Sequence, residues 1–191
     1  MSDPQAAPHT GVRLVHSYLV GAAERRAIRA LCDAAFDGDF DEHDFDHCLG
    51  GMHALCWAEN ASEHPRLLGH ASVIARSVVG DDVPLRCGYV EAVAVHPGYQ
   101  RRGIGDALMS AIGEVIVGAY DLGALGTSAA GRGLYLRHGW LPWRGELACI
   151  SPRGLIPTPD DAGAVMVLPV PGRVLDLGAL LACDWRAGDV W

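Results

Sequence analysis

The sequence predicts one α/β domain of the α+β kind, built on a mixed, mostly antiparallel central sheet flanked by helices. A chain of 191 residues is close to the usual size of a single domain. Half of the residues are apolar and a fifth are charged, which is typical of soluble globular proteins. Strand-like segments surround one central strand–loop–helix–strand unit, so we expect a flexible N-terminus over residues 1–10 and one domain over residues 11–191.

The first third of the domain predicts a strand and two helices. Residues of high β-propensity favour a strand over Val12–His16, and apolar residues recur on one helical stripe over Ala22–Phe36. A short, acidic helix is expected over Asp41–Leu49, with Asp41 as its N-cap and Gly50 at its end.

An antiparallel meander follows. Its strands are expected at Met52–Ala58, Leu67–Val79 and Leu85–His96, joined by turns over Asn60–Pro65 and Gly80–Pro84.

The third strand of the meander places one carboxylate among apolar neighbours. If no bulge intervenes, its alternate residues lie on one face of the sheet. They are Leu85, Cys87, Tyr89, Glu91, Val93 and Val95.

The second half of the chain begins with a Gly- and Arg-rich loop over Pro97–Gly105. Apolar residues at every fourth position from Ile104 to Ile116 predict a helix, and a strand over Ala119–Thr127 follows. We expect a further helix from a Ser128 cap to His138, with Gly139 as its left-handed stop.

The remainder of the chain predicts two more strands, over Glu146–Ile150 and Val165–Val170, with a Pro- and Gly-rich loop between them. No internal repeat or linker is present, so the sequence predicts no second domain.

Charge and cysteine usage narrow the class of protein. A formal net charge of -8 gives no attraction to nucleic acid or to anionic membranes, so neither partner is expected, and it suits a basic substrate. The six cysteines form no CxxC pair and are expected to be reduced core residues. The sequence has no signal-peptide pattern and no apolar run of about 20 residues, which predicts a cytoplasmic protein.

The segment Val90–Gly105, VEAVAVHPGYQRRGIG, joins a strand to a helix through a glycine-rich loop. Gly103 and Gly105 let the backbone come close to a ligand, while N–H groups at the helix start point at a diphosphate. Neighbouring arginines add charge-assisted hydrogen bonds. The loop resembles the acyl-CoA pyrophosphate loop of the GNAT superfamily, written Q/R-x-x-G-x-G/A, and lacks the further residues of a Rossmann or P-loop site.

This resemblance implies splayed central strands and acetyl-CoA as co-substrate. In the superfamily, backbone groups of the strand before the loop bind the pantetheine arm, and by resemblance the Val93 N–H polarises the thioester carbonyl in an oxyanion-hole role. The implied cofactor-binding residues are Val93, Ala94, Val95, Gln100, Arg101, Arg102, Gly103, Ile104, Gly105 and Asp106.

Acetyl transfer to an amine needs a proton acceptor for the ammonium and a proton donor for the departing thiolate. Glu91 lies on the cofactor strand and fits the acceptor, directly or through water. Tyr135 matches the family tyrosine that donates to sulfur. The expected catalytic residues are therefore Glu91, Tyr135 and Val93.

Longer segments resemble the aminoglycoside 2'-N-acetyltransferases over about residues 11–191. They are GDF (38–40), LGGMHAL (49–55), LRCGYVEAVAV (85–95), GWLPW (139–143), TPDD (158–161) and CDWRAGDVW (183–191). The resemblance implies acetylation of the 2'-amine of aminoglycosides, and hence aminoglycoside resistance. Polycationic amino sugars require spaced negative charge. The implied substrate-binding residues are Asp39, Asp44, Glu91, Ala92, Thr127, Asp161, Asp189 and Trp191, the last through its terminal carboxylate.

Two other functions stay open at this point. A GNAT enzyme that acetylates a polyamine, a protein amine or an endogenous amino sugar would also use an acidic pocket, since fold does not fix the substrate. A non-catalytic acyl-CoA-binding module would dispense with Glu91 and Tyr135.

The sequence predicts no metal site. His43 and His47 stand four residues apart beside Cys48, but no further ligands are spaced to complete a tetrahedron. Family analogy favours a homodimer.

Overall fold

The structure is a computed structural model that describes residues 11–58 and 66–191. The N-terminus over residues 1–10 and the turn expected over Asn60–Pro65 lie outside the described residues. The strands are β1 (Arg13–His16), β2 (Met52–Trp57), β3 (Leu67–Gly80), β4 (Val83–Val95), β5 (Leu122–Gly126), β6 (Leu141–Pro142), β7 (Leu147–Ser151), β8 (Gly154–Pro157), β9 (Val165–Pro169) and β10 (Leu181–Asp184). The helices are α1 (Ala22–Ala35), α2 (Glu42–His47), α3 (Ile104–Ala119) and α4 (Arg132–Arg137), with 3-10 turns η1 (Ser17–Leu19), η2 (Pro97–Tyr99) and η3 (Pro159–Asp161).

The strands form one mixed sheet in the order β6-β9-β5-β4-β3-β10-β7-β8. The long strand β3 has two neighbours on one side, because its first half pairs with β2 and its last residues pair with β10. The meander β2–β3–β4 is antiparallel as predicted, whereas β4–β5 and β10–β7 are parallel. The prediction of a mixed, mostly antiparallel sheet in an α+β fold is confirmed.

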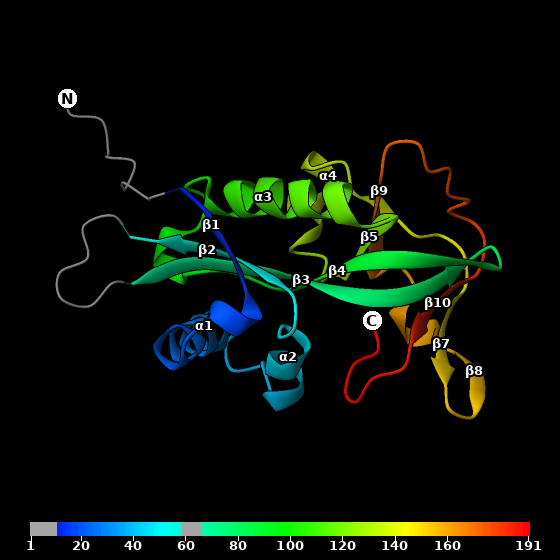
Figure 1. Ribbon diagram of the computed structural model, residues 1–191, viewed down its shortest axis with the longest axis horizontal. Helices are drawn as coiled ribbons and strands as arrows, with labels where there is room; N and C mark the ends of the chain where they lie inside the picture. The colour runs from blue at the N-terminus through cyan, green and yellow to red at the C-terminus, as the bar shows by residue number, and fades with distance from the viewer. Residues whose placement is uncertain (1–10, 59–65) are drawn as a thin grey trace.

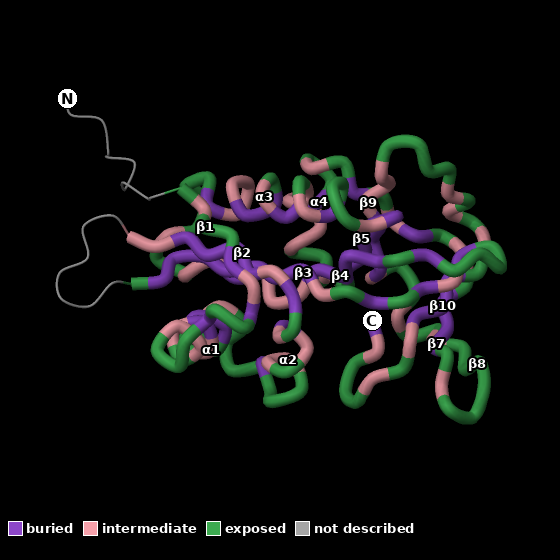
Figure 2. The backbone as a smooth tube through the Cα atoms, in the orientation of Figure 1, coloured by how far each residue is buried: buried purple, intermediate pink, exposed green. Residues whose placement is uncertain are grey.

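The sheet is covered on both faces. α3 lies on one face and α1 and α2 on the other, and the C-terminus ends on the side of α2 (Figure 1). The buried stretches follow the central strands and the inward side of α3 (Figure 2). Within residues 11–58 and 66–191, no helix is both long and apolar enough to cross a membrane.

A β-bulge at Ala92 exchanges the two faces of β4. Before the bulge, the alternate residues from Leu85 to Tyr89 pack into one core cluster, and after it Val93 and Val95 pack against the cluster beneath α3. The pairing register with β3 shifts at this point, and Ala92 has a φ of +49°. Because a bulge inserts one extra residue, the single-face alternation expected along the whole strand does not extend past it.

The two central strands part next to the bulge. The ladder between β4 and β5 ends at Tyr89 and Ala124. Beyond this pair, β4 stays with β3 as far as Val95, and β5 stays with β9 as far as Gly126. This is the splay that the GNAT resemblance implied.

Local capping signals place several boundaries as predicted. Asp41 caps α2 through a reciprocal pair of hydrogen bonds with Asp44, and Gly139, which follows the C-cap residue of α4, has a φ of +80°. Ser128 does not cap α4, however. That helix begins at Arg132 and follows a turn in which the Gly131 N–H bonds to the Ser128 carbonyl oxygen.

Other boundaries differ because they depend on tertiary pairing. The β3–β4 turn contains only Asp81 and Asp82, both with positive φ, and Pro84 lies within β4. Ala119 belongs to α3 and not to the following strand. The strands β6, β8 and β10 were not predicted, and β10 is held by its neighbours β3 and β7.

Candidate active site

A cavity of about 550 Å³ lies where β4 and β5 part. Segments from both halves of the chain line it, including the α1–α2 connection, the bulge of β4, the β5–α4 loop, η3 and the C-terminus. Its lining residues are Phe36, Asp39, Phe40, Asp44, Tyr89, Val90, Glu91, Ala92, Val93, Gly126, Thr127, Ser128, Gly131, Tyr135, Asp161, Ala164, Asp189 and Trp191. All eight residues expected to bind substrate are among them, together with Val93 and Tyr135.

The cavity is acidic. Among the described residues that line it, every charged side chain is a carboxylate, from Asp39, Asp44, Glu91, Asp161 and Asp189. Trp191 lines the cavity beside them. Glu91 is ion-paired with Arg186, and the clustered aspartates around the same cavity make its potential negative, which attracts a multiply charged cation.

Two of these carboxylates have distinct surroundings. One oxygen of Asp44 accepts the Asp41 N–H at 2.9 Å in the capping box of α2, which fixes the side chain at the cavity wall.

Burial raises the pKa of Asp161. A hydrogen bond from Thr158 lowers this pKa, whereas the nearby carboxylates of Asp189 and Asp160 raise it further. Asp160 itself is exposed and is not among the lining residues.

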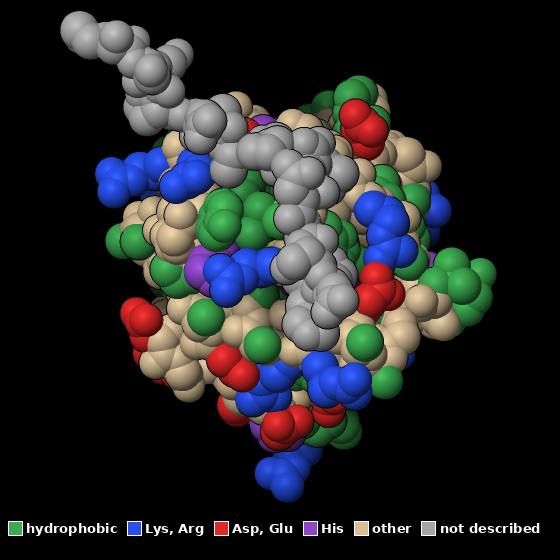
Figure 3. Space-filling view, turned by 90° about the vertical axis from the view of Figure 1, so that its left-hand side faces the viewer, with side chains coloured by type: hydrophobic (Ala, Val, Ile, Leu, Met, Phe, Trp, Pro, Cys, Tyr) green, Lys and Arg blue, Asp and Glu red, His purple; other side chains and the backbone are tan. Residues whose placement is uncertain are grey.

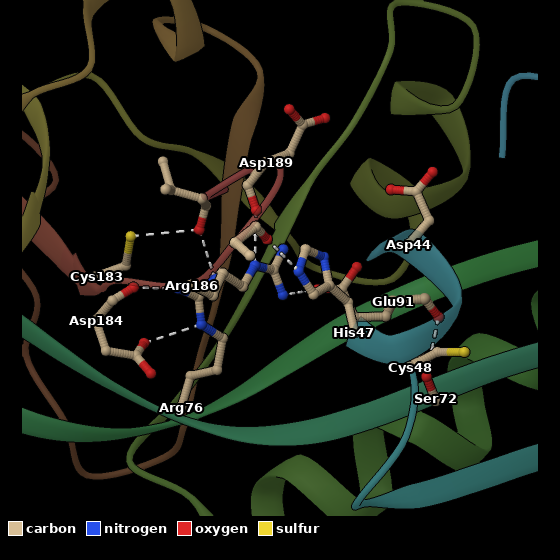
Figure 4. Close-up of polar contacts among 12 residues, drawn as sticks. Asp44, His47, Cys48, Ser72, Arg76, Glu91, Cys183, Asp184, Arg186 and Asp189 are labelled. Carbon is tan, nitrogen blue, oxygen red and sulfur yellow. Dashed lines mark hydrogen bonds and ion pairs between the residues drawn. The ribbon is translucent and has the colours of Figure 1, made fainter. Parts of the chain in front are cut away.

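The C-terminal segment is fastened to the sheet by Arg76 of β3 (Figure 4). The Arg76 side chain is only 3% exposed and donates to the Asp184 side chain at 2.9 Å. It also donates to the carbonyl oxygens of Asp184 and Val190, both at 2.6 Å. The loop between these residues is thereby closed, and the residues at its end are directed into the cavity.

Trp191 lies inside the fold. Its side chain is buried, and its indole N–H donates to the Thr158 hydroxyl at 3.0 Å. Gly126 faces the terminal carboxyl group, because a Cβ at that position would lie 3.4 Å from the Trp191 carboxyl carbon. The last residue is therefore packed and anchored beside β5.

Glu91 has a cationic partner that the sequence did not indicate. Its carboxylate forms an ion pair with Arg186 of the C-terminal segment, and the guanidinium of Arg186 also lies 5.2 Å from the centre of the Tyr89 ring. The apolar neighbours inferred from the strand pattern are thus only part of its surroundings. The sequence could not indicate this contact, because Glu91 and Arg186 are 95 residues apart in the chain.

Tyr135 of α4 meets the cavity from the α3 side. It is 8% exposed and packs edge-on against Trp140 at 6.2 Å between ring centres. Burial raises the pKa of its hydroxyl to about 12, so the group carries its proton at neutral pH.

Tyr89 is a lining residue that sequence reasoning missed as a site residue. Its ring is buried beneath the guanidinium groups of Arg76 and Arg186. Its hydroxyl oxygen is itself buried and makes no hydrogen bond with any of the described residues. An unpaired buried hydroxyl is uncommon in folded proteins, and this one lies directly behind the cavity wall.

The glycine-rich loop lies at the end of the molecule where β4 gives way to α3. Gly103 adopts a φ of +81° as the N-cap of α3, and Gln100, Arg101 and Arg102 are exposed. Basic side chains are exposed at several places on this end of the molecule (Figure 3). The N-terminus of α3 therefore presents free N–H groups beside exposed arginines, which suits a diphosphate.

Two other predicted residues of this loop have different partners. Asp106, in the first turn of α3, accepts hydrogen bonds from His138 at 3.0 Å and Arg137 at 3.2 Å. Ile104 is buried in the core beneath α3, so only its backbone faces the loop.

The histidines of α2 lie near the C-terminal segment. His47 donates from Nε2 to the Ala187 carbonyl oxygen at 2.7 Å, and His43 packs against Gly188. Across residues 11–58 and 66–191, no group of three or more His, Cys, Asp or Glu residues is placed to hold a metal ion.

The sequence matches one family model and resembles a relative of the same length class. A family model described as the acetyltransferase (GNAT) family matches residues 20–140. The chain is 45% identical over 187 residues to an aminoglycoside 2'-N-acetyltransferase of Mycolicibacterium fortuitum, covering 96% of this chain and 92% of that protein.

Solved structures share the fold at low sequence identity. A GNAT family N-acetyltransferase (YhbS) of Escherichia coli in complex with CoA has a TM-score of 0.60 at 16% identity, over 97% of this chain and 93% of that one. The ribosomal-protein-S18-alanine N-acetyltransferase of Escherichia coli has a TM-score of 0.57 at 17% identity, over 85% and 96%.

Proposed function

The chain belongs to the acetyltransferase (GNAT) family, and on that premise we propose that it transfers the acetyl group of acetyl-CoA to the 2'-amine of aminoglycosides. The observation that carries this proposal is a cavity in which five acidic side chains gather around the open part of β4. Aminoglycosides carry several ammonium groups, and spaced carboxylates bind such cations with specificity. The similarity to an aminoglycoside 2'-N-acetyltransferase supports the same substrate class.

The acyl donor is expected along the open edge of β4. The His96 N–H bonds to the Leu68 carbonyl oxygen on β3 at 2.9 Å, so the Val95 carbonyl, on the opposite side of the same trans peptide, points toward the open edge. Backbone groups of Val93 and Val95 there would pair with the amide-bearing arm of the donor. The exposed loop Gln100–Gly103 and the start of α3 would hold its diphosphate.

Three groups of this chain serve the chemistry. The Glu91 carboxylate accepts the proton of the substrate ammonium, directly or through water, so that the amine can attack the thioester carbonyl carbon. The Val93 N–H donates to the carbonyl oxygen, which gains negative charge as the C–N bond forms. The Tyr135 hydroxyl gives a proton to sulfur as the C–S bond breaks.

The other carboxylates of the cavity orient the acceptor. Asp161 and Asp189 hold ammonium groups that do not react. Glu91 lies on β4 itself, the strand along which the acetyl group is expected.

The proposal is tested by following thiol release from acetyl-CoA with purified protein that carries no C-terminal tag. The acceptors are two aminoglycosides that differ in having a 2'-amine or a 2'-hydroxyl, with a polyamine and a peptide amine for comparison. We expect turnover with the 2'-amine compound alone. Turnover with the polyamine or the peptide but with neither aminoglycoside would overturn the proposed substrate.

A further inference from the structure

A chain of hydrogen bonds runs through the core from η1 to the bulge of β4. The Ser17 hydroxyl lies 2.8 Å from His53 Nε2, and His53 Nδ1 lies 2.9 Å from His70 Nε2. His70 Nδ1 lies 2.8 Å from the carbonyl oxygen of Ala92, a residue of the cavity wall. The chain therefore ends at the candidate active site.

The chemistry of these groups fixes the direction of the chain. A carbonyl oxygen only accepts, so His70 carries its proton on Nδ1 and donates to Ala92. His70 Nε2 then accepts from Nδ1 of His53, and Nε2 of His53 accepts from the Ser17 hydroxyl. Each neutral ring uses one donor and one acceptor, which satisfies every ring nitrogen.

Both histidines are fixed in this state by burial. Their exposed fraction is 0%, and burial lowers the pKa of His53 to about 4 and that of His70 to about 3. The Ser17 end is also held, because its hydroxyl oxygen accepts the N–H groups of Gly50 and Gly51 at 2.8 and 3.1 Å.

The last bond of the chain sets the direction of one peptide unit. The Ala92 carbonyl and the Val93 N–H belong to the same trans peptide, so they point in opposite directions. A carbonyl turned toward His70 directs the Val93 N–H away from it. Ala92 holds a φ of +49°, which non-glycine residues seldom adopt without support from their surroundings.

We infer that His70, backed by His53 and Ser17, is a positioning residue that turns the Ala92–Val93 peptide so that the Val93 N–H faces the reacting carbonyl. The inference rests on the proposed function, in which that N–H stabilises the developing negative charge. A hydrogen bond to the carbonyl also polarises the peptide unit, which makes its N–H a stronger donor.

Two substitutions at position 70 separate this role from simple packing. His70→Asn keeps an amide N–H at the place of Nδ1, next to Ala92, and loses the contact with His53. His70→Gln keeps an amide group at the place of Nε2, next to His53, and loses the contact with Ala92. Each variant gives up one buried hydrogen bond, so they are matched in stability cost.

The readouts are kcat and KM for both substrates, the thermal unfolding midpoint, and the amide shift of Val93 by NMR. We expect kcat to fall about 10²-fold in His70→Gln, as when an oxyanion donor is lost, with KM for acetyl-CoA little changed. His70→Asn should keep kcat within a few fold and keep the Val93 shift. Equal losses of kcat in both variants, in step with their unfolding midpoints, would overturn the inference.

Two controls separate failure of the inference from other failures. The ring-nitrogen shifts of His70 in the unaltered protein must indicate a proton on Nδ1, and a proton on Nε2 instead would overturn the inference without any variant. If the unaltered protein released no thiol with any amine, the proposed function would fall. The Val93 shift in the two variants would still decide whether His70 orients the peptide.

Discussion

The carboxylate of Glu91 and the guanidinium of Arg186 form an ion pair that ties β4 to the C-terminal segment (Figure 4). Both side chains are about 15% exposed, and Arg186 also donates from Nε to the Asp189 carbonyl oxygen at 2.7 Å. The proposed proton acceptor and the segment that brings Asp189 to the cavity are therefore held by one side chain, that of Arg186.

Replacing Arg186 tests this link. In Arg186→Met, Glu91 loses its cationic partner and the Asp189 carbonyl oxygen loses its hydrogen-bond donor. Removing one partner of a partly buried ion pair costs more free energy than removing one partner of an exposed pair. We therefore expect kcat/KM for the amine to fall at least about tenfold. Arg13→Met is the control, because it removes a more exposed ion pair, with Glu24, and neither residue lines the cavity. Steady-state kinetics of both variants give the comparison, and equal values would contradict the link.

Glu91→Gln tests the proton acceptor directly. Without a base, kcat should fall about 10²- to 10⁴-fold, while the Kd of acetyl-CoA measured by titration stays unchanged because the carboxylate is not assigned to the donor. Glu114→Gln on the exposed side of α3 is the control. Full turnover in Glu91→Gln would remove Glu91 from the mechanism.

The buried C-terminus predicts sensitivity to extension. Residues appended after Trp191 displace the terminal charge from its place beside Gly126 and crowd a packed position. We expect KM for the amine to rise about tenfold or more, in line with loss of a charged contact. The same peptide fused before Met1 serves as the control, and an unaltered KM with the C-terminal fusion would show that the terminal carboxylate does not bind substrate.

Asp161 predicts how amine binding depends on pH. Because burial raises the pKa of Asp161, its carboxylate takes up a proton, and loses its charge, at a higher pH than that of an ordinary aspartate. Amine KM should therefore rise on acidification in the unaltered protein, and this rise should be smaller in Asp161→Asn. Asp82→Asn, at an exposed position of the β3–β4 turn that does not line the cavity, should follow the unaltered profile. Identical profiles for all three proteins would exclude this role of Asp161.

The buried histidines predict the direction in which stability depends on pH. The pKa values of His53 and His70 in the folded protein, about 4 and about 3, lie below the value of about 6.5 expected in the unfolded chain. Between these values the unfolded chain binds protons that the folded protein does not. The free energy of unfolding should therefore be highest above about pH 6.5 and fall as pH drops toward 4.

Denaturant titrations over this pH range measure the effect. His70→Asn removes one of the two groups, so its free energy of unfolding should fall less steeply than that of the unaltered protein. An equal slope would mean that His70 is protonated in the folded state.

Local signals in the sequence were sufficient for part of the fold. A cap such as Asp41 and a stop such as Gly139 act within one turn of helix, so their residue types identify them. The acidic residues of the cavity came from resemblance, since they lie on four separate segments that only the folded chain brings together.

Features that depend on distant pairing were missed. The bulge at Ala92 is set by register with β3 and by the His70 contact, neither of which is encoded in the residues around it. Arg186 and Tyr89 also gave no signal, because their roles arise from the return of the C-terminal segment to β4.

The most direct test of the proposed activity is the position of the acetyl group in the product. The protein is incubated with acetyl-CoA and an aminoglycoside that has a 2'-amine among its other amines, and the product is analysed by NMR. The proposal, supported by the 45% identity to an aminoglycoside 2'-N-acetyltransferase, predicts a single acetyl group on the 2'-nitrogen. Acetylation at any other amine, or at several of them, would contradict the account.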